Sequence, residues 1–500
     1  MDSASEDPAK RHHNQYRQAV PDHVLRPLVE KYYKYGYGDK NMLAAIKKDI
    51  DLQSHHWTLS TKTLQRRRKQ WGFLSARQQG HNLETVAPFI EMLRLHSANQ
   101  LGAKSMRDHL RDSSIMVSRH LVLAYQQQTD PVGNKQRLAR RLKKAVHWSA
   151  GAHERWSMDQ HDKWRRFGLF LHVGIENFSN AVLWLKVWWT NSNPRLITRY
   201  YLEAATNLGG IPMLTQSDPG TENHGVANAQ TTLRRQLDPT LVGTLQHQWM
   251  RGHTNIKPEI FWSKLRHQWS EGWERMFEDG LQEGWYDPFE LVESMLFRWL
   301  AVPMIQVDLD RFARIHNSSR PRQDRHKAMP AELPLELLDR PEEYGPYRNY
   351  KITVSKELLK AAEEVYAPAD HEVFQLVPEL FDRHAAELYL LLGKPQVNRF
   401  SFWGVYLAML EGLQTISGAE LSQIFDVAQE RALREAIVKH EFLEVIPGQA
   451  HRGPAMVGPG LEESVDQEEH LSQEVDGDGG DFSEEGCEDD LPVVELTEYV

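Results

Sequence analysis

Three short acidic motifs lie in the region that decides the fold of this chain, residues 156–269: Trp156-Ser-Met-Asp159, Ser217-Asp218-Pro-Gly220 and Asn255-Ile-Lys-Pro-Glu259. Asp159 and Asp218 follow predicted strands, and Glu259 lies on a predicted helix. Because residues at the ends of neighbouring strands meet at one edge of a sheet, we expect the three carboxylates to form one site.

The residues between these motifs predict a mixed five-stranded sheet flanked by helices. Two apolar runs, 167–175 and 181–189, are rich in strand-forming residues, and the turn between them predicts a hairpin. With the strand that ends at Asp159, the order becomes three strands followed by alternating helices and strands, which is typical of an α/β core. The later expected elements are helices at 194–208, 226–236 and 256–277 and strands at 211–215 and 244–250.

Carboxylates in this arrangement suit phosphodiester chemistry with two Mg²⁺ or Mn²⁺ ions. Hard divalent cations prefer carboxylate oxygens, and a pair of them can stabilise the attacking and leaving oxygens of a displacement. The chain contains 69 acids, so any single acid is more often structural than catalytic. Asp162 and Glu222 are close enough in sequence to substitute in the assignment, but Glu222 is expected in a turn that leads away from Asp218.

The N-terminal segment has the pattern of a helix-turn-helix unit over residues 21–75, after a flexible stretch at 1–20. Its third helix is basic and is capped by Ser60 or Thr61. Polar residues at the start of this helix would read bases and the basic run would contact phosphates, although a solvated basic face on a packing helix fits the pattern too. The residues expected to contact DNA here are Thr61, Thr63, Gln65, Arg66, Arg67, Arg68 and Lys69.

Residues 84–130 predict a second helical unit, also compatible with a helix-turn-helix but less basic. The basic linker 131–150 then leads into the core region, which we assign to 151–330 with a helical extension. The linker either follows a phosphate backbone or is a solvated connection. Its candidate DNA-binding residues are Arg140, Arg141, Lys143 and Lys144.

The C-terminal part predicts a proline-rich linker at 331–350, a small α-helical domain at 351–447 and a disordered acidic tail at 448–500. Residues 461–500 carry 16 acids and no Lys or Arg, whereas residues 1–150 carry 26 Lys and Arg against 13 Asp and Glu. The formal net charge of −10 therefore includes the opposite charges of a basic N-terminal segment and an acidic C-terminal tail. The basic segment suggests a polyanionic partner.

The composition also excludes several classes of protein. Cys487 is the only cysteine and lies in the acidic tail, which excludes a disulfide framework and a cysteine zinc site in the folded region. With no apolar signal core and no long apolar span, we expect a soluble, intracellular protein that does not contact membranes.

The three acidic motifs together resemble the retroviral-type integrase core, the ribonuclease H-like fold shared with DDE transposases. In that family the two aspartates and the glutamate of Asn-x-x-x-Glu bind the metal ions, which implies Asp159, Asp218 and Glu259 here. The 40 residues between Asp218 and Glu259 exceed the family's commonest spacing of about 35, which an insertion would absorb. Residues 20–330 also resemble integrase-core proteins of eukaryotic mobile elements, which implies duplex DNA as partner, a homo-oligomer on DNA and a nuclear location.

Two functions follow from the resemblance. The first is an integrase or transposase that cuts and joins DNA at mobile-element ends. The second is a domesticated, catalytically inactive DNA-binding protein that retains the fold. A ribonuclease H-like nuclease acting on RNA–DNA hybrids is a third, weaker possibility. The presence of all three acids favours the first.

Overall fold

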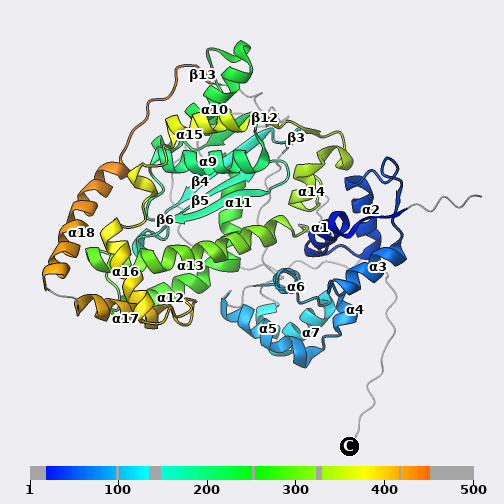
Figure 1. The fold of residues 1–500 in the computed structure, drawn as a ribbon, viewed down its shortest axis with the longest axis horizontal. Coiled ribbons are helices and arrows are strands. Elements are labelled where there is room, and N and C mark those ends of the chain that lie inside the picture. The colour runs from blue at the N-terminus through cyan, green and yellow to red at the C-terminus, as the bar shows by residue number, and fades with distance from the viewer. Residues whose placement is uncertain are drawn as a thin grey trace, which may run out of the picture. The chain divides into compact units, whose positions relative to one another are not determined.

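The computed structural model describes residues 18–96, 101–134, 148–250, 254–321, 329–415 and 418–450 (Figure 1). The predictions for Arg140, Arg141, Lys143 and Lys144, for the acidic tail beyond residue 450 and for most of the N-terminal stretch lie outside these residues.

The centre of the described chain is a mixed five-stranded sheet, as the sequence predicts, with the strand order β10-β8-β4-β5-β6. Strands β4, β5 and β6 form an antiparallel meander, and β8 and β10 add in parallel beside β4. This sheet, flanked by helices, is consistent with a ribonuclease H-like core. Its strands are β4 (Arg155–His161), β5 (Phe170–Glu176), β6 (Val182–Trp188), β8 (Leu214–Ser217) and β10 (His247–Trp249).

Two strand boundaries differ from those predicted. The run that begins at residue 167 starts with a 3-10 turn, Arg165–Phe167, and enters the sheet only at Phe170. The predicted strand 244–250 is divided into β9 (Thr244–Leu245) and β10, and β9 pairs with β13 (Gln449–Ala450) instead of the central sheet. Apolar composition marked both runs, but it does not show where a strand joins its neighbours.

The sheet is covered on both faces because its side chains alternate between two apolar clusters. In β5, Leu171 and Val173 face one cluster, whereas His172 faces the other, where the Trp184 indole donates to it. Gly174 lies under the same indole, and a Cβ atom there would be 2.3 Å from the Trp184 ring. The first face is covered by α11 (Ile256–Leu265), α12 (Glu271–Gln282) and α13 (Leu291–Asn317), and the second by α9 (Pro194–Leu208), α10 (His224–Leu237) and α15 (Lys356–Tyr366).

The long helix predicted from residue 256 contains a π-helical turn, Arg266–Ser270, between α11 and α12. The Trp269 and Trp273 indoles flank its end, and both donate to Oδ2 of Asp308, at 2.7 and 3.0 Å. A π turn inserts an extra residue and rotates the helix after it. Here the turn sets the face of α12 that packs against α13.

The N-terminal region forms helices around an apolar cluster that includes Tyr32, Ile46 and Leu64. Ser60 caps the basic helix by accepting from the Thr63 amide, as predicted. The connection 50–60 before that helix is longer than the roughly three to four residues of a typical helix-turn-helix, so that assignment stays a prediction. The helices are α1 (Asp22–Lys34), α2 (Asp39–Asp49) and α3 (Thr61–Gln70), followed by α4 (Ala76–Gln79), α5 (Leu83–His96), α6 (Ala103–Asp112) and α7 (Arg119–Thr129).

The C-terminal helices share the apolar clusters of the core. Phe381, Phe402 and Ile424 lie in the cluster formed by α11–α13, and Leu359 lies in the cluster on the other face. Short pairings add to these contacts, since β12 (Ile352–Thr353) pairs with β7 (Gly210–Ile211). The helices are α16 (Glu379–Leu391), α17 (Phe402–Gln414) and α18 (Gly418–Lys439), and the predicted linker contains α14 (Pro334–Asp339).

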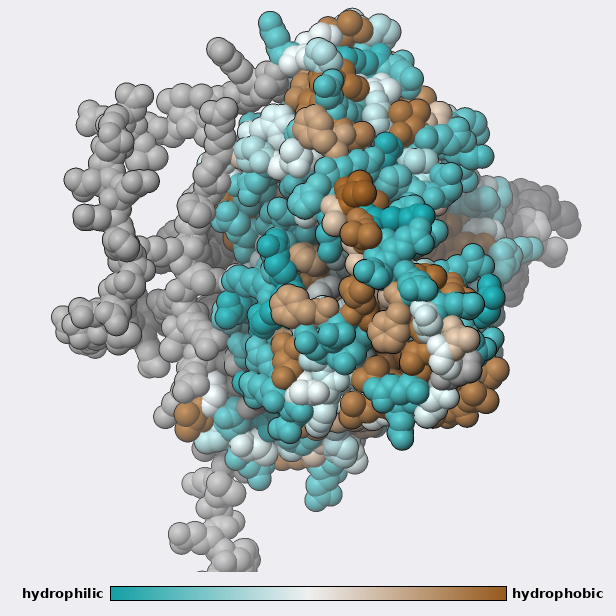
Figure 2. Space-filling view, turned by 90° about the vertical axis from the view of Figure 1, so that its left-hand side faces the viewer, coloured by the Kyte–Doolittle hydropathy of each residue, from teal (hydrophilic) through white to brown (hydrophobic). Residues whose placement is uncertain are grey.

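Apolar side chains also reach the surface of the C-terminal helices. Figure 2 shows hydrophobic surface among the polar residues on the side of the molecule where α16–α18 lie. The exposed apolar residues of this region include Leu391, Phe400, Leu433 and Ile437. In the described parts of the chain, no helix combines the length and the apolar character needed to cross a membrane.

Candidate functional site

Asp159 and Asp218 lie at the same level on neighbouring strands. Strands β4 and β8 run parallel, and Ser157 pairs with Gln216. Two residues further along, the same register brings Asp159 level with Asp218. Asp159 lies within β4, two residues before its end at His161, whereas Asp218 directly follows β8. The predicted strand-end placement is therefore accurate for Asp218 and slightly early for Asp159.

Helix α11 is attached to β4 beside Asp159 through the first residue of the predicted Asn-x-x-x-Glu motif. The Asn255 side-chain amide donates to the Met158 carbonyl at 2.9 Å. This contact fixes the start of α11 against the strand. Glu259 lies in the first turn of the helix that follows.

A second contact fixes the orientation of α11. The Trp262 indole donates to Oδ2 of Asp159 at 2.9 Å, and the ring of His161 stacks on the Trp262 indole with centroids 4.7 Å apart. Residues three apart lie on the same side of a helix, so Glu259 lies one turn before Trp262 on the side that faces Asp159.

The three carboxylates influence one another electrostatically. The pKa of Asp159 is raised from 3.8 to about 7, chiefly by burial and further by the negative charges of Asp218 and Glu259, while the Trp262 hydrogen bond opposes the shift. The structure therefore brings the predicted residues into one corner. Asp159 is half-buried, whereas Glu259 is exposed.

The carboxylates of Asp159, Asp218 and Glu259 are suitable ligands for a hard divalent cation, but their side chains do not converge on one point. Among the described residues, no group of three His, Asp, Glu or Cys side chains is close enough together to hold a metal ion. Neighbouring negative charges that raise the pKa of a carboxylate, as they do for Asp159, are nevertheless typical of sites that bind cations. Binding would require the exposed Glu259 side chain to turn toward the aspartates.

Glu222 corrects one expectation from the sequence. The turn after Asp218 was expected to lead Glu222 away, but Glu222 is buried and its carboxylate lies over Gly220, where a Cβ atom would be 2.0 Å from it. Burial raises the pKa of Glu222, and the charges of Asp162 and Asp218 raise it further. The 3-10 turn Thr221–Asn223 folds the side chain back toward the site, so Glu222 is a fourth acid beside Asp218.

Asp162 has structural partners instead. Its carboxylate accepts from the Asn191 amide at 2.8 Å and from the Arg165 guanidinium at 2.7 Å. These contacts satisfy both oxygens, and the ion pair offsets the negative charge. Asp162 is therefore less suited to bind a metal ion than Asp159 or Asp218.

The basic residues of α3 divide between two sides of the helix. Arg68 is buried, 3.3 Å from Asp39, and Arg67 pairs with Asp22 at 3.1 Å. Both guanidinium groups hold the helical unit together. The residues of the predicted interface that remain exposed are Thr61, Gln65, Arg66 and Lys69, while Thr63 is half-buried.

Sequence reasoning included Asn255 in the Asn-x-x-x-Glu motif, but it assigned neither Asn255 nor Trp262 a role in positioning the site. The spacing of Trp262, three residues after Glu259, was a usable signal because it places both residues on one side of a helix. Its hydrogen-bond partner lies 103 residues earlier in the chain, and such a distant pairing is not visible in a local pattern.

Comparison with known proteins agrees with this arrangement. The family model described as "Integrase core domain" matches residues 146–338, the segment that contains the whole central sheet and the three carboxylates. No curated protein matches the chain significantly. Residues 146–338, which hold the acids and the mixed sheet, are therefore similar to the integrase core domain.

Proposed function

We propose that this protein catalyses metal-dependent cleavage and transfer of DNA strands, as an integrase or transposase acting at the ends of mobile elements. The observation that carries the proposal is the Trp262–Asp159 hydrogen bond, which holds the helix of Glu259 against the strand of Asp159 while the strand register brings Asp218 alongside. These contacts position the backbone that carries the three acids, and rigid positioning of this kind is how active sites favour charged transition states.

Asp159, Asp218 and Glu259 would hold Mg²⁺ or Mn²⁺ in this proposal, in a two-ion site with Asp159 between the other two carboxylates. Such ions would supply stabilisation of the charge that develops on the reacting phosphate. The chain's own contribution is positional. Asn255 fixes the start of α11, and Trp262 fixes the carboxylate of Asp159.

The proposed substrate is duplex DNA in the nucleus, bound by a homo-oligomer that holds two DNA ends. Arg66 and Lys69 extend from the exposed side of α3 and are suited to phosphates, and Thr61 and Gln65 lie near its start, where base contacts are made. Contacts from the basic residues 140–144 belong to the same proposal. A steep fall of DNA affinity with salt is the expected signature of these contacts.

The test is a nicking and strand-transfer assay with Mn²⁺ and supercoiled or end-containing DNA. Asp159→Asn, Asp218→Asn and Glu259→Gln should each lower activity by at least about 100-fold while the proteins stay folded. Glu364→Gln, on the exposed side of α15, is the matched control and should leave activity unchanged. Activity that survives all three substitutions would refute the assignment.

A second function, an inactive DNA-binding protein that retains the integrase fold, is favoured by one observation. In the described part of the chain, the acids are not close enough together to form a metal-binding group. Under this alternative, DNA binding with a steep salt dependence persists, but no cleavage is detected with Mn²⁺ or Mg²⁺. Cleavage confined to RNA–DNA hybrids would instead indicate a ribonuclease H-like nuclease.

A further inference from the structure

A cavity of about 690 Å³ lies on the side of α11 opposite Glu259. Lys257, Phe261 and Lys264 line it, and these residues are spaced along one side of the helix, whereas Glu259 and Trp262 lie on the other. Helices α6 and α7, the end of α13 and residues 319–321 and 329–331 supply other lining residues. A cavity of this volume is in the range of sites for small ligands, roughly 300–1,000 Å³.

The described lining is strongly cationic. It contains one acid, Asp108, which already accepts from the Arg107 and Arg111 guanidinium groups, each at 2.9 Å. The charge of that acid is therefore offset outside the cavity. The positive side chains of the lining are Lys104, Arg119, Lys257, Lys264 and Arg320.

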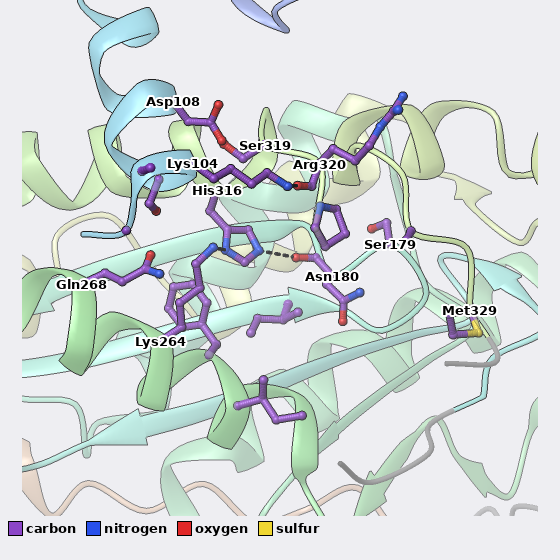
Figure 3. A pocket seen from close by; sticks show the side chains of 18 of the residues that line it. Lys104, Asp108, Ser179, Asn180, Lys264, Gln268, His316, Ser319, Arg320 and Met329 are labelled. Carbon is purple, nitrogen blue, oxygen red and sulfur yellow. Dashed lines mark hydrogen bonds between the residues drawn. The ribbon is translucent and has the colours of Figure 1, made fainter. Parts of the chain in front are cut away.

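Lys264 is held at the cavity by a neutral partner. Figure 3 shows its ammonium group beside the His316 ring, with Nδ1 at 2.8 Å, and the opposite ring nitrogen facing the Asn180 carbonyl at 2.9 Å. An ammonium group can only donate, so Nδ1 accepts, and Nε2 carries the proton that is donated to the carbonyl. Lys257 donates to the Asn180 side-chain oxygen at 2.6 Å and completes the arrangement.

The environment of Lys264 would favour an anion. Burial lowers the pKa of Lys264 to about 8; the nearby Asp108 opposes the shift, and Lys104 adds to it. At neutral pH Lys264 is therefore still charged while it lies close to another cation. A bound anion would relieve that repulsion.

Two neutral features point into the same cavity. Gly102 through Ser105 line it with the first turn of α6, whose cap residue is Gly102 and supplies no side-chain hydrogen bond. The positive end of a helix dipole favours anions, and phosphate above all. Ser319 also lines the cavity, and among the described residues its buried hydroxyl has no hydrogen-bond partner, so it is available to a ligand.

We propose that this cavity binds phosphate groups, with Lys104, Lys264 and Ser319 as the principal contacts. The phosphates would belong either to a small soluble polyphosphate or to a nucleic-acid backbone. Lys104, Arg119, Lys257 and Lys264, a helix start and a buried hydroxyl together match the donors that phosphate oxygens require. Arg320, the fifth cation of the lining, pairs with Glu332. The cavity lies across α11 from the acidic corner, so this binding does not depend on the proposed catalysis.

The experiment measures binding of inorganic tripolyphosphate by calorimetry and of a fluorescent DNA duplex by anisotropy, with the full-length protein. Lys264→Met and Lys104→Met should each weaken binding of at least one probe by about tenfold or more. Lys360→Met, a highly exposed lysine on α15, is the matched control and should bind as the parent does. Ser319→Ala should give a smaller loss in the same direction.

The two sources are separated by which probe responds. Tripolyphosphate binding that depends on Lys264 indicates a small polyphosphate, whereas a loss confined to DNA indicates a backbone contact. If Lys264→Met fails to fold, the half-buried Lys104 carries the test. Unchanged binding of both probes in Lys104→Met and Ser319→Ala would overturn the proposal. Asp159→Asn should retain tripolyphosphate binding. Phosphate binding in the cavity and catalysis at the acids are therefore tested independently.

Discussion

The indole nitrogen of Trp262 lies 2.9 Å from Oδ2 of Asp159 and donates a hydrogen bond to it. This bond connects the helix that carries Glu259 to the central strand, so the positions of two candidate metal ligands are coupled through a third residue. Asn255 anchors the same helix about two turns before Trp262. The geometry of the acidic corner therefore depends on α11 as much as on the sheet.

Trp262→Phe should weaken Mn²⁺ binding by roughly 10- to 100-fold, because it removes the hydrogen bond that orients Asp159 but keeps an aromatic ring. Isothermal titration with Mn²⁺ and the strand-transfer assay measure the effect. Trp273→Phe is a suitable control because it loses a comparable hydrogen bond to Asp308 away from the acids. Equal Mn²⁺ affinity in the two variants would show that Trp262 only packs.

The two sides of α3 should respond differently to substitution. The double variant Arg66→Ala with Lys69→Ala should lower DNA affinity and reduce the salt dependence by about two phosphate contacts, with little change in stability. Arg68→Ala should instead destabilise the protein by about 2–3 kcal/mol, because it leaves the partly buried Asp39 without its ion pair. Anisotropy at several salt concentrations and thermal melts distinguish the effects. The reverse pattern would contradict the observed orientation of the helix.

Phe402→Ala should destabilise the whole folded unit by about 3–5 kcal/mol, although Phe402 lies beyond the integrase core segment. Its ring is fully buried and lies 5.7 Å from Phe277 and 5.5 Å from Phe297, measured between centroids. Phe400→Ala is the matched control, because the side chain of Phe400 is 67% exposed. Denaturant unfolding followed by tryptophan fluorescence reports the difference. Equal effects of the two substitutions would indicate that α17 contributes little to the core.

The stability of the protein should fall as the pH decreases below about 6.5. Burial lowers the pKa of His172 from 6.5 to about 3, so the unfolded chain takes up a proton that the folded chain excludes. This group alone should remove about 2 kcal/mol of stability between pH 7.5 and pH 5.

Replacing the imidazole with an uncharged acceptor tests the origin of that loss. In His172→Gln the amide oxygen can still accept from the Trp184 indole, which donates to His172 at 3.0 Å, and the loss between pH 7.5 and pH 5 should shrink. His440→Gln, at an exposed position, should leave the pH dependence as it is. Denaturation midpoints at the two pH values provide the comparison.

Much of the sheet could be predicted from the sequence because its signals are local. Apolar runs rich in strand-forming residues marked β5 and β6, and the two aspartates were assigned to strands that proved to be neighbours. Their shared level depends on the parallel pairing of β4 and β8, which is compatible with the predicted mixed sheet but was not itself predicted. The integrase resemblance concerned the same residues, and the family match confirmed it.

The errors arose where a side chain depends on a distant partner. The basic run of α3 gave no sign that Arg67 and Arg68 turn inward, because that depends on where Asp22 and Asp39 come to lie. Glu222 was misplaced for a related reason. Its turn was recognised, but the direction in which the turn folds depends on packing against Gly220 and Asp218.

The family match ends at residue 338, yet Phe381, Phe402, Ile424 and Ala428 fill the same apolar interior as α12 and α13. A fragment with the boundaries of the family match would expose that apolar side of α13 to solvent and would tend to aggregate. The C-terminal helices are thus an integral part of the folded unit. These helices complete the interior of the integrase core, so the two parts should unfold together.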